Sequence, residues 1–344
     1  MEKFRDKIFN EEVFERYRKT LPSTKENSLI KNGLFTVVNK YKALMDEQTG
    51  GYQVKEPIKG RIGGTPVNYD GNTDIPAGSE RDTFYQNKIC YGRAKAWGEY
   101  DFASDITGEN FMAEANEVNE YWDEQRQSTV LAILAGIFGM TGGVNGQFVS
   151  KHTYDITGTA SPNLSADALN RASQKALGDK KAKLDVIFMH SAVSTNLEGL
   201  NLIEFLKYTD ANGIQRDLTI GTFNGRLVIV DDEMPVTSDS TGDIYTSYVF
   251  QKGFFEYENI GATKGSEIVR NAYEKGGRTD LVTRVREMIV PMYISYKGTG
   301  SVSPTNEAFA NGSNWELANN DKTGASKVYV DDKLIPVARV ISRG

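Results

Sequence analysis

A stretch of about forty residues, from Gly50 to about Gly92, limits most strongly what this chain can fold into. It has few large apolar side chains, and glycines and prolines that favour turns recur at close intervals. They are Gly50, Gly51, Gly63, Gly64, Gly71, Gly78, Pro57, Pro66 and Pro76. A segment of this length that cannot bury itself is unusual in a compact domain, and such loops are commonly functional. We expect a two-stranded excursion that leaves the body of the subunit, with a flexible surface insertion as the alternative.

The clearest regular element is a helix over residues 107–138. Its apolar positions repeat with a period of 3.6 residues. They are Phe111, Ala115, Val118, Trp122, Thr129, Ile133 and Ile137. Glu109 complements the N-terminal dipole, and Gly139 is placed to end a rod of about 45 Å. The second half is apolar nearly all round, which predicts that this end is deeply buried.

The other segments mix helices and strands without regular alternation, which favours an α+β fold. The first fifty residues predict a mostly helical arm, with apolar stripes near Val13–Tyr17 and Leu34–Leu44. Beyond residue 150 we expect a helix over 166–177, capped by Ser165 and Gly178 and stapled by Leu164 and Leu169, and a helical stretch at 197–206. We expect strands at 184–189 (buried), 245–250, 254–257 and 281–296. Hairpins are expected at Asn224-Gly225 and, as the last element, over 327–341.

Composition excludes several classes of function. Lys and Arg number 40 against 46 Asp and Glu, and this net charge of −6 disfavours a dedicated nucleic-acid binder. One cysteine, Cys90, and two histidines allow neither an intrachain disulfide nor a zinc site made only of Cys and His. The N-terminus lacks the apolar core of a signal peptide, and the longest apolar run, 130–138, is far shorter than the ~20 residues that span a bilayer. We expect a soluble protein made in a cytoplasm.

Two segments could carry chemistry, and each has a simpler interpretation. The glycine-rich residues 139–146 resemble a phosphate-binding loop, but they follow a helix and lack the Gly-Lys-Ser/Thr ending, so we favour a flexible connector. Asp231, Asp232 and Glu233 follow a strand and could hold Mg²⁺ for phosphoryl transfer. Neighbouring side chains on a strand point to opposite faces, so we favour a solvated strand end.

The remaining candidates also favour structural roles. His190 is interpreted as a structural residue near a helix N-terminus, and His152 as an exposed loop residue. Cys90 has no partner motif for nucleophilic catalysis. Trp97, Trp122 and Trp315 are interpreted as core or interface aromatics. The sequence therefore predicts no catalytic, metal-binding or cofactor-binding residue.

Collinear strings between about residues 90 and 320 carry a specific resemblance. They are RAKAWGEYD (93–101), EYWDEQRQ (120–127), MHSAV (189–193), NLIEF (201–205), VIVDDEMP (228–235), YTSYVF (245–250), PTN (304–306) and NWE (314–316). In these strings and in its order of elements the chain resembles the major capsid proteins of tailed bacteriophages. That family has the Hong Kong-phage-type fold, which encapsulin nanocompartments share. The first ninety residues match only at 12–14 and in the position of the loop.

The resemblance implies an N-terminal arm (1–50), an extended β-hairpin loop (51–93), a peripheral domain with a long spine helix (94–150 and 245–300) and an axial domain (151–244 and 301–344). It implies a structural protein without cofactors that self-assembles, as hexamers and pentamers, into the icosahedral head shell around double-stranded DNA. Scaffold, portal and possibly decoration proteins are the implied partners. DNA is contacted only non-specifically, no membrane is involved, and assembly takes place in the bacterial host cytoplasm before the protein resides in the virion. Some relatives crosslink a loop lysine to an asparagine of another subunit. Lys55, Lys59 and Asn68 are available here, but no motif identifies them as crosslinking residues, and whether crosslinks form stays open.

Three alternatives stay open at this point. An encapsulin-like shell protein has the same fold and encloses cargo enzymes instead of a genome. A metal-dependent phosphotransferase would use Asp231, Asp232 and Glu233. A phage tail-tube protein, the weakest alternative, would form open tubes.

Overall fold

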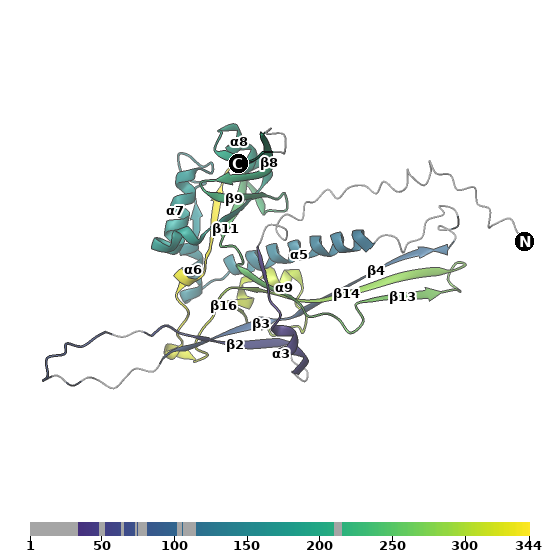
Figure 1. Ribbon diagram of the computed structural model, residues 1–344, viewed down its shortest axis with the longest axis horizontal. Helices are drawn as coiled ribbons and strands as arrows, with labels where there is room; N and C mark the ends of the chain where they lie inside the picture. Colours follow the sequence, from purple (N-terminus) through teal and green to yellow (C-terminus); the bar gives the residue numbers. More distant parts are fainter. Residues whose placement is uncertain are drawn as a thin grey trace, which may run out of the picture.

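The structure, a computed structural model, describes residues 34–47, 52–62, 65–72, 74, 81–101, 105, 115–209 and 215–344. Two sheets dominate this part of the chain, and a long helix runs between them (Figure 1). The helix expected near Val13–Tyr17 and the acidic residue expected at the start of the long helix, Glu109, lie outside the described residues.

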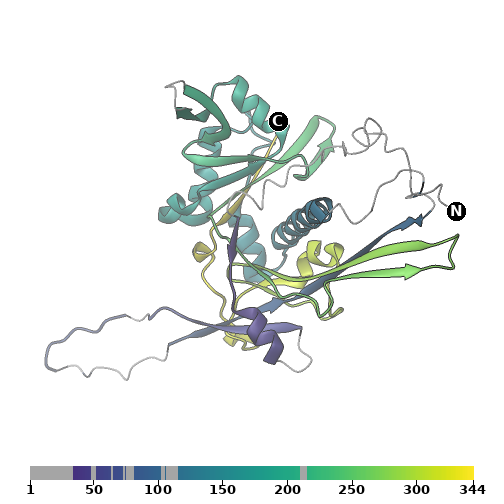
Figure 2. The same cartoon turned by 45° about the vertical axis from the view of Figure 1, so that its right-hand side comes forward.

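A five-stranded sheet is built around β14 (Arg278–Pro291). On one edge β14 pairs with β4 (Tyr91–Tyr100), and on the other with β12 (Phe255–Asn259) and β13 (Ser266–Asn271). The short strand β1 (Phe35–Val37) adds to β12 in parallel. Together β4, β13 and β14 extend well beyond the rest of the sheet, and we call this projection the long arm (Figures 1 and 2).

The spine of the subunit is helix α5 (Ala115–Phe138), about 36 Å long at 1.5 Å per residue. Its second half is buried in the central core, as expected, with Ile133 and Ile137 fully inaccessible. The helix ends one residue before Gly139, also as expected. Near this end it is crossed by α9 (Asn306–Ala310), which precedes a short 3₁₀ turn, η3 (Gly312–Asn314).

An eight-stranded sheet forms the other half of the molecule. In spatial order it contains β5 (Thr153–Asp155), β17 (Val337–Ser342), β11 (Gly242–Phe250), β6 (Val186–Met189), β9 (Arg226–Val230), β8 (Gln215–Phe223) and β7 (Ile203–Thr209), with β10 (Val236–Asp239) paired to β11. Helices α6 (Gly143–His152), α7 (Ala166–Leu177) and α8 (Ser191–Gly199) belong to the same half.

The predicted helix caps of α7 and the predicted turn between β8 and β9 are confirmed in this half of the molecule. The Ser165 hydroxyl accepts a hydrogen bond from the Ala168 amide at 3.2 Å, and Gly178 ends α7 with a φ of 60°. Asn224 and Gly225 both have positive φ between β8 and β9, as a two-residue hairpin requires.

The segment rich in glycine and proline contains a hairpin that leaves the body, as the sequence predicts. Strands β2 (Gln53–Lys59) and β3 (Thr83–Ile89) pair antiparallel along their full length, and α3 (Tyr41–Glu47) packs at their base. Beside the base, β15 (Ile294–Tyr296) pairs with β16 (Trp315–Leu317). The remaining short turns are η2 (Gly178–Lys183), η4 (Gly324–Ser326) and η5 (Asp332–Leu334).

Three expectations about local structure are wrong. The helix expected over 197–206 lies earlier, because His190 caps α8 and Asn201, with a φ of 54°, turns the chain into β7. The last hairpin expected over 327–341 does not form, because β17 pairs with β11 and β5 instead. The connector expected over 139–146 is in part helical, since α6 begins at Gly143.

The positions of three elements bear on the expected domain boundaries. Strand β11, expected in the peripheral part, belongs to the eight-stranded sheet, while α9 and β16 pack beside the spine and β15. The division into an arm, a loop and two domains stays a prediction. No single helix in the described part of the chain is long and apolar enough to span a bilayer; only α5 and α6 taken together, bent by 114°, have that length and apolarity.

Candidate functional site

The hairpin and the long arm project from opposite sides of the molecule (Figures 1 and 2). Both carry exposed apolar side chains. They are Ile62, Val67 and Tyr69 in the hairpin loop and Ile268, Val269 and Tyr273 on the arm. The two tyrosines are 84% and 98% exposed, respectively. Apolar side chains gathered on projections indicate surfaces that contact other molecules.

The hairpin is held to the body by a cluster that we call the hairpin clamp: Lys40, Tyr41, Glu56, Lys88 and Glu256. The Lys88 side chain is 2% exposed, and its Nζ pairs with Glu56 and, at 3.0 Å, with Glu256 Oε2. Lys40 Nζ lies 3.1 Å from Glu56 Oε1 and 3.4 Å from Glu256 Oε1, and the Tyr41 hydroxyl donates to Glu256. Two cations and two carboxylates therefore balance in a site that joins α3, both hairpin strands and β12.

Opposing effects act on the pKa values of the clamp carboxylates. Burial raises the pKa of Glu56, but Lys88 and Lys40 outweigh it and hold this pKa below its ordinary value. Burial likewise raises the pKa of Glu256, and the Tyr41 hydroxyl and Lys88 lower it further than burial raises it. The two clamp carboxylates, Glu56 and Glu256, are therefore ionised at neutral pH.

A second carboxylate on β12 holds the start of α3. Glu258, 3% exposed, accepts hydrogen bonds from the backbone amides of Lys40 at 3.0 Å, Tyr41 at 2.7 Å and Lys42 at 2.9 Å. These amides have no partner within the helix, and a carboxylate is the favoured group beside them. The start of α3, beside the hairpin, is thus fixed to the five-stranded sheet.

The spine is tied to both sheets by buried polar contacts. Arg126 Nε lies 2.7 Å from Glu287 Oε1 on β14, and the Tyr257 hydroxyl donates to the same oxygen at 3.0 Å. On the other side, Gln127 Nε2 donates to Asp231 Oδ2 at 2.6 Å, at the end of β9. Adjacent residues of one helix therefore link the two halves of the subunit.

The acidic cluster after β9 differs from the expected solvated strand end. Asp231 is 7% exposed, and its second carboxylate oxygen accepts the Glu233 amide at 2.8 Å. Asp232 is exposed, as expected. Among the residues that the structure describes, no group of three His, Cys, Asp or Glu side chains is arranged to hold a metal ion.

The structure confirms the expectation for one histidine and contradicts the expectation for the other. His190 is a helix cap, as expected: its Nδ1 accepts the Ala192 amide of α8 at 3.1 Å. The expectation for His152 is wrong, because it ends α6 and is 1% exposed, with Nδ1 2.6 Å from the Val337 carbonyl oxygen and its ring against Phe148. Burial lowers the pKa of His152.

The other candidates are structural in the folded chain. Cys90 is buried, and burial raises the pKa of its thiol. Trp122 and Trp315 are core residues, and Trp97 packs edge-on against Trp122, as expected. Lys55 forms an ion pair with Asp321.

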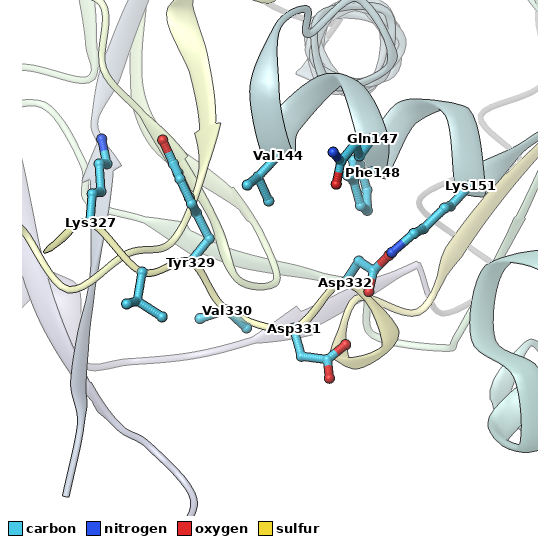
Figure 3. A pocket seen from close by; sticks show the side chains of 10 residues that line it. Val144, Gln147, Phe148, Lys151, Lys327, Tyr329, Val330, Asp331 and Asp332 are labelled. Carbon is cyan, nitrogen blue, oxygen red and sulfur yellow. The ribbon is translucent and has the colours of Figure 1, made fainter. Parts of the chain in front are cut away.

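A groove of about 470 Å³ lies between α6 and residues 327–332 (Figure 3). Val144 and Val328 form exposed apolar walls, and a Lys151–Asp332 ion pair of 2.7 Å lies at one end. The groove combines apolar walls with charges that are paired, an arrangement without the converging acid and base groups of an active site.

Comparison with known proteins agrees with a structural role. The chain is 29% identical over 306 residues to the major capsid protein of Bacillus phage SPP1, which covers 86% of this chain and 87% of that protein. The chain is therefore similar over most of its length to a phage major capsid protein. No family model matches the sequence.

Solved structures confirm the capsid fold. The capsid asymmetric unit of cyanophage Pam1 matches with a TM-score of 0.54 and 10% identity, over 90% of this chain and 88% of that one. A structure of Mycobacterium phage Bobi matches with a TM-score of 0.51 and 14% identity, over 95% and 94%. The mixed fold expected from the sequence, of the Hong Kong-phage type, is therefore confirmed.

Sequence reasoning missed the residues that position the capsid projections. The clamp joins residues up to about 200 positions apart, so no local motif marks it. One signal was available: Glu56 and Lys88 are a glutamate and a lysine in the two halves of a segment expected to pair with itself. Nothing comparable pointed to the Gln127–Asp231 contact.

Proposed function

We propose that this structural capsid protein self-assembles into the icosahedral head shell that encloses the double-stranded DNA of a tailed phage. One observation supports this most strongly: apolar side chains are exposed on two projections at opposite sides of the molecule. A contact between unlike surfaces of identical subunits generates closed rings when the rotation closes. Hexamers and pentamers are such rings, and they are the assemblies we propose.

The same arrangement needs no catalysis. Interfaces of a stable assembly bury about 1,600 Å² or more, and projections lying across neighbours supply such area without enlarging the core. We infer a non-enzymatic chain that works with scaffold, portal and possibly decoration proteins and assembles in the cytoplasm of the bacterial host. The net charge of −6 favours only weak, non-specific contact with packaged DNA.

Expression of the chain alone, and then with the neighbouring phage genes, tests the proposal. Light scattering and negative-stain electron microscopy are expected to show closed shells of uniform size. Regular open tubes would contradict it, as would failure to form particles under both conditions. Shells that enclose a cargo enzyme instead of DNA would favour the encapsulin alternative.

A matched variant addresses the metal-dependent phosphotransferase. Asp232→Asn with Glu233→Gln removes two of the three acids and spares the buried Asp231. We expect normal shells and unchanged Mg²⁺ binding by calorimetry. Loss of a stoichiometric Mg²⁺ site in this variant would contradict a purely structural role.

A further inference from the structure

A second hollow, of about 380 Å³, is formed by β4, β14 and the segments beside them. Thr283 and Glu287 of β14 bind side chains of the spine. Successive side chains of a strand point to opposite faces, so Arg284 and Arg286 project from the face of the sheet that is turned away from the spine. Both arginines line this hollow.

Strand β4 leaves space beside the two arginines. In the antiparallel ladder Arg286 lies opposite Gly92 and Arg284 lies opposite Ala94, and both small residues are exposed. A Cβ on Gly92 would meet one described atom within 4 Å, the Val285 carbonyl oxygen at 3.7 Å. Residues that lie directly opposite each other share a face of the sheet. The partner strand therefore covers the two guanidinium groups with nothing larger than a methyl group.

The residues that line this hollow carry positive charge and no negative charge. Three of them are arginines, Arg93, Arg284 and Arg286, and none is an Asp or a Glu. In the described part of the chain the Arg93 guanidinium binds neutral oxygens, among them Asn306 Oδ1 at 3.1 Å and Ser303 Oγ at 3.4 Å. Burial lowers the pKa of Arg93, as expected for a cation without a carboxylate in direct contact. The positive charge of the hollow is therefore not neutralised by its own walls.

Arg284 and Arg286 both keep hydrogen-bond donors available. Arg284 uses Nη1 to bind Glu267 at 3.2 Å and the Lys264 carbonyl oxygen at 3.3 Å, and no described group accepts a hydrogen bond from its Nε or Nη2. Among the described residues no carboxylate pairs with Arg286, whose side chain contacts the thiol of Cys90. A guanidinium carries five N–H donors in a planar fork that matches an oxyanion. The chain thus leaves donors on both side chains for an external acceptor.

We propose that this hollow binds a small oxyanion of the phosphate class, with two negative charges, between Arg284 and Arg286. The two residues are two positions apart on one strand, about 6.6 Å, so the oxygens of one tetrahedral anion can accept hydrogen bonds from both guanidinium groups. Ala262 and Val302 add apolar walls, and charge-assisted hydrogen bonds are stronger in less polar surroundings. A carboxylate has two oxygens, which one arginine fork occupies, so it is the weaker ligand.

The proposed anion lies where several segments meet. Besides β4 and β14, the hollow is lined by Tyr52, which precedes β2, and by Ser303. A ligand that binds only the folded chain raises the free energy of unfolding as its concentration rises. Phosphate therefore stabilises the subunit beyond the effect of salt in general. This site lies within one chain and goes beyond the proposed shell function.

Calorimetric titration of sodium phosphate into the full-length chain, in chloride buffer of matched ionic strength, tests the site. We expect one saturable site per chain, with acetate bound at least tenfold more weakly. Arg286→Gln removes the guanidinium that has no carboxylate partner, and we expect it to weaken phosphate binding at least tenfold. The matched control, Arg61→Gln, removes an exposed arginine outside the hollow and should change the affinity less than twofold.

A second variant keeps all the arginines. Ala94→Glu places a carboxylate opposite Arg284 on the exposed face, where it competes with the anion. We expect phosphate binding at least tenfold weaker than in the unaltered chain, and an unfolding midpoint that no longer rises with phosphate. Ala94→Gln has nearly the same size without the charge, and its affinity should stay within threefold of that of the unaltered chain.

Several outcomes would overturn the site. They are no saturable phosphate binding by the unaltered chain, equal binding of acetate, and unchanged binding by a folded Arg286→Gln or Ala94→Glu chain. An equal loss in Arg61→Gln would also overturn it, because the attraction would then belong to the charge of the whole chain. None of these measurements depends on particle formation, so this site and the proposed function can fail separately.

Discussion

Asp231 is the residue at which the two halves of the subunit meet. Its carboxylate accepts the Gln127 side-chain amide of the spine at 2.6 Å. Removing one partner of a buried hydrogen bond costs about 1–3 kcal/mol. We expect Asp231→Ala to lower the free energy of unfolding by that amount in urea titrations. Asp232→Ala is the control, because the Asp232 side chain is 73% exposed, and it is expected to change the free energy of unfolding by less than about 0.5 kcal/mol. Equal effects of the two substitutions would contradict the role of Asp231.

Lys88 is the buried cation of the hairpin clamp. Breaking a buried ion pair by removing one partner lowers the free energy of unfolding by about 3–5 kcal/mol. Because Glu56 and Glu256 are partly exposed, we expect Lys88→Met to lower it by about 3 kcal/mol at pH 7. Exposed Lys42→Met is the control.

The pH dependence of this loss has a definite sign. The folded-state pKa values of Glu56 and Glu256 lie below their ordinary 4.5, so their contribution is complete above that pH and is lost as pH falls through the folded values. The difference between the unaltered chain and Lys88→Met should therefore shrink below pH 4.5. A constant difference from pH 7 to pH 4 would contradict this account of the clamp.

His152 introduces a second dependence on pH. Burial lowers its folded-state pKa below 6.5, so the unfolded chain binds a proton first as pH falls. Stability should decrease from about pH 6.5 downward, with a slope of at most about 1.4 kcal/mol per pH unit. His152→Asn retains a donor for the Val337 carbonyl but does not titrate, and we expect its unfolding curve to be flatter between pH 6.5 and 5. Parallel curves for the two proteins would contradict this expectation.

At the scale of elements, the crossing of α5 and α9 depends on one glycine. A Cβ on Gly136 would lie 2.0 Å from the Phe309 carbonyl oxygen and 2.4 Å from Trp315 Nε1. Trp315 Nε1 donates a 2.7 Å hydrogen bond to that carbonyl oxygen. Overpacking of this kind costs about 1–3 kcal/mol. We expect Gly136→Ala to lower the unfolding midpoint and alter tryptophan fluorescence. Ala135→Ser, one position away and exposed, should do neither; a stable Gly136→Ala protein with unchanged fluorescence would contradict the close contact.

Elements with local signals could be predicted, and elements made by distant pairing could not. The cap at Ser165, the Asn224-Gly225 turn and the buried half of α5 all depend on residues close in sequence. Strand β17 instead finds β11 and β5, about ninety and 185 positions earlier, so the local pattern suggested a hairpin that does not form. His152 was misjudged for the same reason, since its burial depends on the Val337 strand.

The hairpin shows the same contrast between local signals and contacts made by distant residues. The glycine and proline pattern predicted a hairpin that leaves the body, because few apolar side chains occur in it. The clamp residues that set its direction come from α3, β2, β3 and β12, and only the folded chain brings them together. The resemblance to capsid proteins followed from collinear strings, whereas the projections and the clamp that holds one of them could be found only in the structure.

At the scale of the whole molecule, stability and assembly are assigned to different parts. The core clusters take their residues from the body and the base of the hairpin, whereas Ile62, Val67 and Tyr69 of the loop are exposed. A subunit can therefore be stable alone and still carry a segment whose apolar side chains are covered only by a neighbour. This separation makes the loop removable without unfolding the chain.

Replacement of residues 61–81 by Asn-Gly tests that separation. The Gly60 amide already donates to the Asp82 carbonyl at 2.8 Å, so a two-residue turn can close the hairpin at this point. We expect the free energy of unfolding to change by less than about 1 kcal/mol, because the removed residues described lie outside the core clusters. Particle formation, measured by light scattering and electron microscopy, should be lost because each subunit has no loop to place on its neighbour. Closed shells of normal size from the shortened chain would show that the loop does not hold the shell together, and unfolding of the shortened chain would show that stability and assembly are not separate.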